Sequence, residues 1–178
     1  MRRWRNHGYG HLGISVNISA KQLASATLPA EVTAALSESS LEPSALTLEI
    51  TESVLLDSDA VITRLEDLKE LGVQIAIDDF GTGYSSLNYL RRFPVDTLKI
   101  AKPFVDGVGT SPEQERLASA ILRLGATLGL DTVAEGIEDA RQLERLRRLR
   151  CRYGQGFYFS PPLPAAEIDT FLQRPLVA

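Results

Sequence analysis

The sequence of 178 residues contains one cysteine and only two histidines. A single thiol cannot form a disulfide within the chain, so we expect a fold without disulfides and a reducing, cytoplasmic compartment. We interpret Cys151 as a small apolar filler after a helix. His7 and His11 precede the first strand-like segment, which argues against a zinc site built on imidazole ligands.

Long apolar runs and an excess of basic residues are also missing. No run reaches the roughly 18 residues of a membrane-spanning helix, and no apolar core follows the basic start at Met1–Arg5. We therefore expect no membrane contact from this chain itself. The net charge of −4 argues against binding a nucleic-acid polymer. It leaves room for a small phosphorylated ligand, whose charge bound cations could balance.

The composition is that of an ordinary globular protein, with 44% hydrophobic and 24% charged residues. The length suits one domain, and we find no internal repeat, low-complexity tract or Pro/Gly-rich linker. Residues 1–178 are therefore expected to form a single domain.

Short strand-like runs alternate with amphipathic helical segments along the chain. The strands are expected at Ile14–Ser19, Leu46–Thr51, Val73–Asp78, Thr97–Ala101, Thr132–Glu135 and Gln155–Phe159. The helices are expected at Pro29–Ser39, Ser58–Leu71, Ser111–Leu128 and Asp139–Leu149. This alternation predicts a parallel sheet in an α/β fold.

Side-chain parity distinguishes an open sheet from a barrel. In the first four strands, one face is branched aliphatic and the other is small or polar. A doubly wound sheet, covered on both faces, would have nearly continuous apolar strands. A TIM-like β/α barrel fits better, with its active site at the C-terminal ends of the strands. About six of its eight strands are visible, so the barrel is expected to be incomplete at the N-terminus, before residue 14.

Polar side chains stand near the C-terminal ends of these strands. In chain order they are Asn17, Glu49, Asp78 with Asp79, Lys99, Glu135 and Gln155. On neighbouring strands of one barrel they would converge, and several carboxylates could not stay ionised together without positive charge nearby. Carboxylate and amide oxygens are the ligands of Mg²⁺ or Mn²⁺ rather than of soft metals. The pattern therefore predicts a site for hard divalent cations.

Simpler interpretations exist for the individual residues. Asp78 and Asp79 could belong to an ordinary strand-to-helix turn in which Asp79 caps the helix. Gly81 and Gly83 would allow a mobile loop or positive φ angles there. Lys99 could be a charged clamp among acids or a rim lysine in solvent.

Six segments together resemble the successive motifs of the EAL domain family. They are Ser15–Leu23, Leu48–Ser53, Ile75–Ser86, Pro94–Ile100, Val133–Glu138 and Gln155–Ser160. They occur in the family's order and cover nearly the whole chain. The resemblance implies a bacterial signalling domain that hydrolyses cyclic di-GMP to linear pGpG with two Mg²⁺ or Mn²⁺ ions, and it allows a homodimer.

The resemblance also implies roles for individual residues. Asn17, Glu49, Asp78 and Asp79 would be metal ligands, and Lys99 would lie beside the attacking water. Glu135 would be a further ligand or would orient the water, and Gln155 would contribute to substrate binding. Glu52 would brace the glycine-containing loop after Asp79.

The chain departs from the family pattern at several places. The Glu-Ala-Leu motif, which lies upstream of Asn17 in the family, is absent, and so are the two strands that would precede residue 14. Ala101 stands where an aspartate is usual, on the same face as Lys99, and Pro161 where a basic residue is common. An open barrel would have unpaired edges, so we expect marginal stability, aggregation or pairing with another chain.

Two other functions are weighed against hydrolysis. The chain could be a catalytically inactive relative that only binds the nucleotide or a protein partner. Alternatively, a lysine inside a barrel could form a Schiff base with a carbonyl substrate, but that chemistry needs a neutral amine. Nearby acids would instead keep Lys99 protonated.

Overall fold

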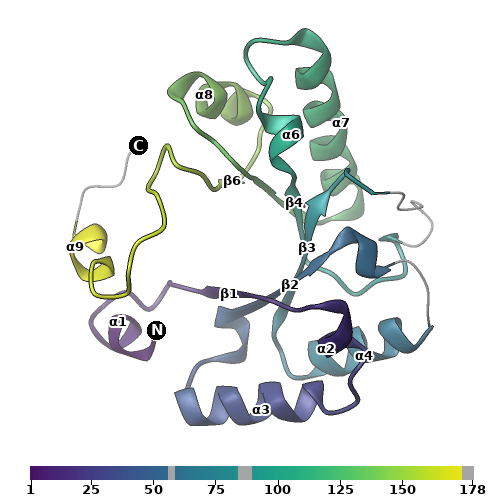
Figure 1. Cartoon of the computed structure of the whole chain (residues 1–178), viewed down its shortest axis with the longest axis vertical. Helices are drawn as coiled ribbons and strands as arrows, with labels where there is room; N and C mark the ends of the chain where they lie inside the picture. Colours follow the sequence, from purple (N-terminus) through teal and green to yellow (C-terminus); the bar gives the residue numbers. More distant parts are fainter. Residues whose placement is uncertain (56–58, 84–89, 174–178) are drawn as a thin grey trace.

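The fold is seen in a computed structural model that describes residues 1–55, 59–83 and 90–173. Its strands form one parallel sheet in chain order, as the alternating pattern predicts (Figure 1). The strands are β1 (Ile14–Asn17), β2 (Leu46–Thr51), β3 (Gln74–Phe80), β4 (Thr97–Ile100), β5 (Asp131–Ala134) and β6 (Tyr153–Gly154). Together with the surrounding helices they make a half-barrel.

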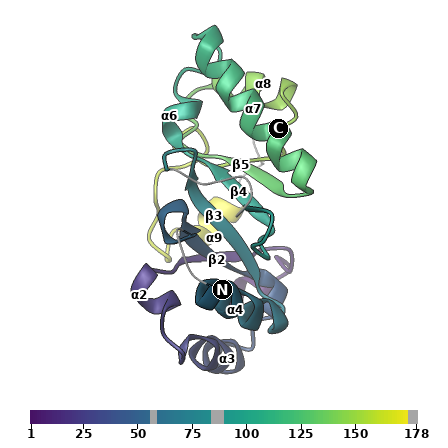
Figure 2. The same ribbon diagram turned by 90° about the vertical axis from the view of Figure 1, so that its right-hand side faces the viewer.

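The longer helices lie outside the sheet, with α3 and α4 toward one end and α7 and α8 toward the other (Figure 2). The α-helices are α1 (Arg2–Asn6), α2 (Ala20–Leu23), α3 (Leu28–Ser39), α4 (Asp59–Glu70), α6 (Lys102–Val105), α7 (Pro112–Leu128), α8 (Ala140–Arg148) and α9 (Ile168–Leu172). Two 3₁₀ turns are η1 (Pro43–Ala45) and η2 (Glu52–Leu55). In the described part of the chain, no helix has the length and apolarity needed to cross a bilayer.

The four expected helices are present, and local signals explain their ends. The Ser111 hydroxyl accepts a hydrogen bond from the backbone of Gln114 at the start of α7, and Gly129 ends the helix at φ 72°. Asp139 caps α8 in a reciprocal pair with Gln142. Ser58, the expected first residue of the second helix, lies outside the described residues.

The core lies between the aliphatic faces of the strands and the outer helices, as parity predicts. Ile75 and Ile77 of β3 and Leu98 of β4 have no measurable exposure. They belong to a cluster that also contains residues from α3 and α4, and a second cluster joins Ile100 to α7 and α8. The central strands are therefore held by apolar burial on their outer face.

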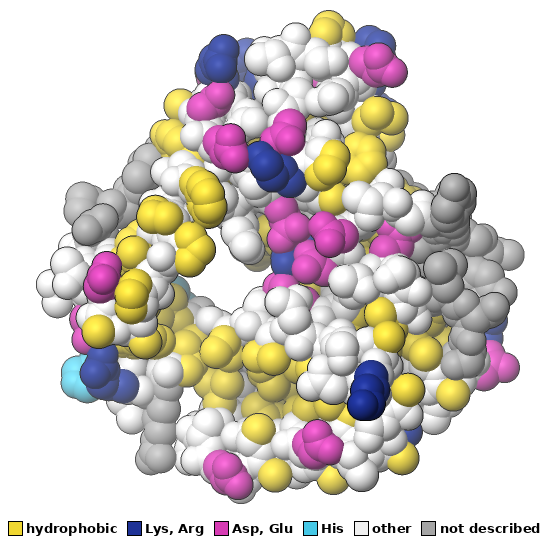
Figure 3. All heavy atoms as spheres, in the orientation of Figure 1, with side chains coloured by type: hydrophobic (Ala, Val, Ile, Leu, Met, Phe, Trp, Pro, Cys, Tyr) yellow, Lys and Arg dark blue, Asp and Glu magenta, His cyan; other side chains and the backbone are white. Residues whose placement is uncertain are grey.

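Strand β1 departs from the expected burial. Ile14 and Val16 pair in register with Leu46 and Leu48, so they lie on the same face of the sheet. They are nevertheless 41% exposed, because β1 is an edge strand that lacks the cover given to its neighbours. In the described residues β1 and β6 end the sheet and do not pair with each other. Figure 3 shows the opening that results, to one side of the centre.

Helices α1 and α9 approach each other on this open side (Figure 1). Arg3 of α1 forms an ion pair with Asp169 of α9, and the indole of Trp4 donates a hydrogen bond to the same carboxylate. The ring of elements is thus completed by surface contacts between short helices instead of by strands.

The sixth strand was predicted in the wrong place. The aromatic run Gln155–Phe159 has high strand propensity, but pairing with β5 stops at Gly154. Beyond it the chain turns: the amide of Tyr158 donates to the carbonyl of Ile137, and that of Phe159 to the carbonyl of Gly156. A turn at Gly156 and the backbone of Ile137, which is distant in the sequence, take the hydrogen bonds that a longer strand would have used.

Candidate active site

One lysine and three acids meet at the C-terminal ends of four consecutive strands. The Nζ of Lys99 lies 2.7 Å from Glu49, 2.9 Å from Asp78 and 2.8 Å from Glu135. Figure 3 shows the same feature as a group of acidic side chains around a basic one at the centre of this face. The predicted convergence of these four residues is therefore present.

Strand register and a local irregularity position these side chains. Glu49 and Lys99 point inward from β2 and β4, and Glu135 follows the last residue of β5, where its amide donates to the carbonyl of Ile100. Strand β3 continues past its expected end at Asp78, but its register shifts between Ile77 and Phe80. Asp79 takes φ 53° in this bulge, which changes the direction in which neighbouring side chains point.

The cluster is shielded from water and strongly charged. The side chains of Lys99, Asp78 and Glu135 are 6%, 17% and 16% exposed. Burial by itself lowers the pKa of Lys99, but hydrogen bonds to Glu135, Glu49 and Asp78 outweigh it and raise that pKa far above its ordinary value. Burial also raises the pKa of Glu135, against the opposing effect of Lys99 and with the help of the nearby Asp78 charge. The three acids therefore favour the protonated, ammonium form of Lys99.

Three other predicted site residues lie at the same strand ends without joining the cluster. Asn17 is the register partner of Glu49 and is exposed. Asp79 is exposed, and Gln155 bonds to the β5 side only through its backbone. Among the described residues, no ion pair or hydrogen bond connects their side chains to Lys99.

Glu52 makes the contacts expected of a brace. It is buried, and its Oε2 accepts hydrogen bonds from the backbone amides of Gly81 at 2.7 Å and Gly83 at 3.2 Å. Gly81 has φ 98°, and a Cβ there would lie 2.7 Å from the ring of Phe104. The first turn of the loop after β3 is thus fixed to the end of β2. Tyr84–Ser86 of this motif lie outside the described residues.

The sequence reasoning missed the support behind Glu135. The side chain of Lys102 lies against Gly136, where a Cβ would meet its Cγ at 2.5 Å. Its Nζ bonds both Asp106 and Glu138, each at 2.7 Å. The loop carrying Glu135 is therefore connected to α6. The signal available was Glu138, an acid within a recognised motif to which no role was given.

The sequence itself matches a known family over most of its length. The model of the EAL domain covers residues 1–162. This chain belongs to the EAL domain family. The resemblance seen in its motifs is confirmed, and so is the β/α class of its fold.

Several EAL proteins are similar to this domain. It is 47% identical over 169 residues to MucR of Pseudomonas aeruginosa, described as a bifunctional diguanylate cyclase/cyclic di-GMP phosphodiesterase, covering 94% of this chain and 25% of MucR. The solved MucR phosphodiesterase in complex with c-di-GMP superposes with a TM-score of 0.89 over 94% of this chain and 68% of that one. BlrP1 of Klebsiella pneumoniae, solved with manganese and c-di-GMP, is 28% identical with a TM-score of 0.82, over 90% and 42% of the two chains. The chain thus spans about a quarter of MucR.

The donor chemistry of this EAL domain suits a hard divalent cation. Each of Glu49, Asp78 and Glu135 directs a carboxylate oxygen to one point, and three negative charges face one positive charge. The point itself is taken by the Lys99 ammonium. Within residues 1–55, 59–83 and 90–173, no three His, Cys, Asp or Glu side chains are arranged to hold a metal directly.

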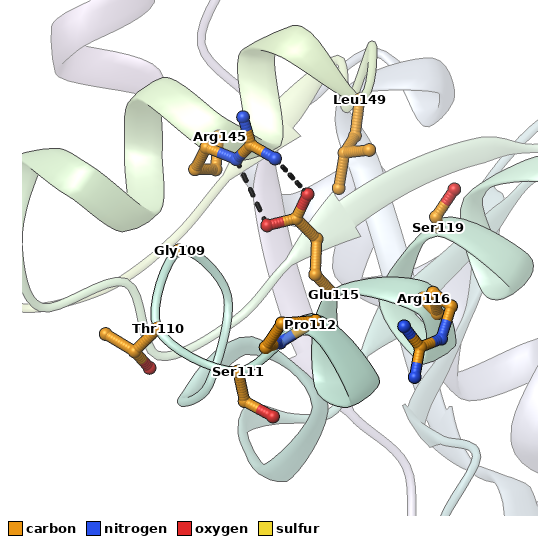
Figure 4. A pocket seen from close by; sticks show the side chains of 9 residues that line it. All are labelled: Gly109, Thr110, Ser111, Pro112, Glu115, Arg116, Ser119, Arg145 and Leu149. Atoms are coloured by element: carbon orange, nitrogen blue, oxygen red, sulfur yellow. Dashed lines mark hydrogen bonds and ion pairs between the residues drawn. The ribbon is translucent and has the colours of Figure 1, made fainter.

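A cavity of about 560 Å³ lies elsewhere on the EAL domain, between the start of α7 and α8 (Figure 4). Glu115 of α7 and Arg145 of α8 both line it, and they form a bidentate ion pair with each other. This pair lowers the pKa of Glu115 through the Arg145 hydrogen bonds. None of the residues that line this cavity belongs to the cluster around Lys99, so the cavity is separate from that cluster.

Proposed function

We propose that this domain hydrolyses cyclic di-GMP to linear pGpG, using two bound Mg²⁺ or Mn²⁺ ions. The observation that carries the proposal is the meeting of Lys99 with Glu49, Asp78 and Glu135 at consecutive strand ends. The similarity to MucR supports the substrate, and the manganese complex of BlrP1 supports the type of ion.

Oxygen ligands for the ions would come from four strand ends. We assign Glu49, Asp78, Asp79 and Asn17 as the ligands, with Glu135 as a further ligand or as the group that orients the water. When bound, such ions lower the pKa of a coordinated water and balance the charge that develops on the phosphodiester.

The side chains of this domain would supply the remaining contacts to the water and to the substrate. Lys99, held protonated, would donate hydrogen bonds to the attacking water or to a phosphate oxygen and stabilise negative charge there. Glu135, whose pKa is raised by burial, would accept a hydrogen bond from the water. Gln155, exposed at the end of β6, would bind the nucleotide, and Glu52 would fix the loop after Asp79.

The same residues disfavour the alternatives. Schiff-base chemistry needs a neutral amine, and the three acids raise the pKa of Lys99. A catalytically inactive receptor for cyclic di-GMP would not need a charged lysine shielded among three acids. Ala101, which is fully buried at the start of α6, leaves the cluster without the carboxylate usual at that position. We therefore expect a slow enzyme.

The proposal includes a cellular setting. As a domain acting on a bacterial second messenger, it would work in the cytoplasm, and its partners would be cyclic di-GMP and a second copy of the chain in a homodimer. Sedimentation equilibrium at two protein concentrations would test the homodimer.

The direct test is incubation with cyclic di-GMP and Mn²⁺, followed by chromatographic detection of pGpG. The variant Glu135→Ala should lower the rate by at least about 100-fold, since it removes a group that contacts the water. Glu115→Ala, which removes an acid from the distant helix junction, is the matched control and should leave the rate unchanged.

Equal loss in both variants would contradict the assignment of Glu135. If the unmodified chain makes no pGpG, it should be fused to an upstream segment that carries the Glu-Ala-Leu motif. No product from that fusion would rule out hydrolysis and leave the receptor function.

A further inference from the structure

Lys99 occupies an unusual position for a lysine in this chain. Among the described residues it is the one lysine whose side chain is buried, at 6% exposed. Lys69 pairs with Asp96 at 27% exposed, and Lys102 pairs with two acids at 47% exposed. In the part of the chain that the structure describes, Lys99 alone among the lysines bonds three acids away from water.

The three acids depend on this one charge. Their oxygens all bond the same nitrogen, so they lie within about 6 Å of one another, a range in which like charges repel strongly. Shielding from solvent increases that repulsion, because little water screens it. Without the ammonium, the cluster would have to take up protons, spread apart or bind another cation.

We propose that Lys99 is an internal counter-ion that holds Glu49, Asp78 and Glu135 together in the metal-free domain, and that a divalent cation competes with it for these carboxylates. The second half rests on the proposed function, which makes the cluster a metal site. Binding a cation then requires the ammonium to release part of its hydrogen bonds. Lys99 thereby lowers the affinity for metal while it keeps the empty site assembled.

The variant Lys99→Met tests this competition, because it keeps an unbranched side chain only one atom shorter than lysine and removes the charge. We expect its Kd for Mn²⁺, measured from the electron paramagnetic resonance of free Mn²⁺, to fall by about tenfold or more relative to the unmodified chain. The thermal midpoint of Lys99→Met should drop in EDTA and recover in excess Mn²⁺.

Lys69→Met is the matched control. It breaks a lysine–acid pair at the opposite end of β3 and β4, so its thermal midpoint should drop equally with and without Mn²⁺. Its Kd for Mn²⁺ should equal that of the unmodified chain. A Lys99→Met variant that binds Mn²⁺ no more tightly than the unmodified chain would overturn the proposal.

A second measurement avoids any dependence on the folding of the variant. In ¹⁵N-labelled unmodified chain, the Nζ signal of Lys99 should be protected from exchange without metal and should shift when Mg²⁺ is added, while that of Lys69 stays in place. An unchanged Lys99 signal at saturating Mg²⁺ would refute the competition. Formation of pGpG by the unmodified chain tests the proposed function, whereas metal affinity and the Lys99 signal test this inference. A failure of one can therefore be distinguished from a failure of the other.

Discussion

The two sides of this half-barrel differ in how their strands are held. In the closed half, β2 to β5 each have a strand on both sides and helices over the outer face. Ile75 and Ile77 there are completely buried. On the open side, every residue of β1 is exposed, and the ring is completed by an Arg3–Asp169 ion pair. The charged cluster around Lys99 lies in the closed half.

The difference shows that a strand's own sequence does not determine its burial. Ile14 and Val16 have the same β-branched character as Ile75 and Ile77, and they face the same layer of the fold. They remain 41% exposed because a neighbour and a cover are missing on one side. The free energy of local opening is therefore expected to be highest around the charged cluster of Lys99 and lowest at β1 and β6.

The largest effect on stability should come from replacing an isoleucine by alanine in the closed half, compared with the same replacement on the open side. Ile77→Ala removes a fully buried side chain and should lower the free energy of unfolding by about 2–5 kcal/mol, because it loses apolar burial and leaves a cavity. Ile14→Ala should cost about 1 kcal/mol or less, since its side chain is already half in water. Urea denaturation followed by circular dichroism gives both values. Similar losses would mean that something covers the open side in solution.

A second comparison concerns two acids in ion pairs. Asp96 in the closed half bonds Lys69 at 2.7 Å and accepts the amide of Ile75 at 2.8 Å, joining α4, β3 and β4. Asp96→Asn should cost about 1–3 kcal/mol, since it weakens two partly buried hydrogen bonds at once. Asp169→Asn removes the charge from the exposed ion pair between α1 and α9 and should leave the thermal midpoint nearly unchanged. The reverse order would mean that this link holds the ring together.

The smallest effect concerns Cys151, which lies two residues before the start of β6. Burial raises the pKa of its thiol, so less thiolate is present in the folded chain than in the unfolded chain at a given pH. At about pH 8.5, near the ordinary pKa of a thiol, iodoacetamide should modify the folded chain at least about tenfold more slowly than the chain in urea. The midpoint of the modification rate plotted against pH should lie at a higher pH for the folded chain than for the chain in urea. Equal rates would show that the region beside β6 opens freely.

Much of the closed half could be predicted from the sequence because its signals are local. Strand Leu46–Thr51 matches its expected bounds, and Ser111, Gly129 and Asp139 mark helix ends by chemistry that acts within one turn. The meeting of Lys99 with three acids followed from parity and strand order. Side-chain parity also gave the correct face for Ile14 and Val16 of β1. Parity predicts toward which face a side chain points, but not whether another element buries it.

The misses occurred where distant contacts decide the structure. The run Gln155–Phe159 has the composition of a strand, yet the carbonyls of Ile137 and Gly156 draw its amides into a turn. The register shift after Ile77 depends on how β3 meets β4, which no local pattern encodes. The support of Lys102 for the Glu135 loop joins residues 36 apart, Lys102 and Glu138. Contacts of this kind, between residues that are distant in the sequence, can be identified only from the folded structure.

The order of the strands has a consequence for how the domain is made. Every strand of the sheet pairs only with strands that are adjacent to it in the chain, so no strand has to wait for a remote partner. Ordering of this kind keeps the loops that must close shorter than pairing of remote strands would, and it allows the sheet to grow one unit at a time during synthesis. The acidic cluster, which draws on β2 to β5, would be complete once β5 has been added, before β6 and α9 emerge from the ribosome.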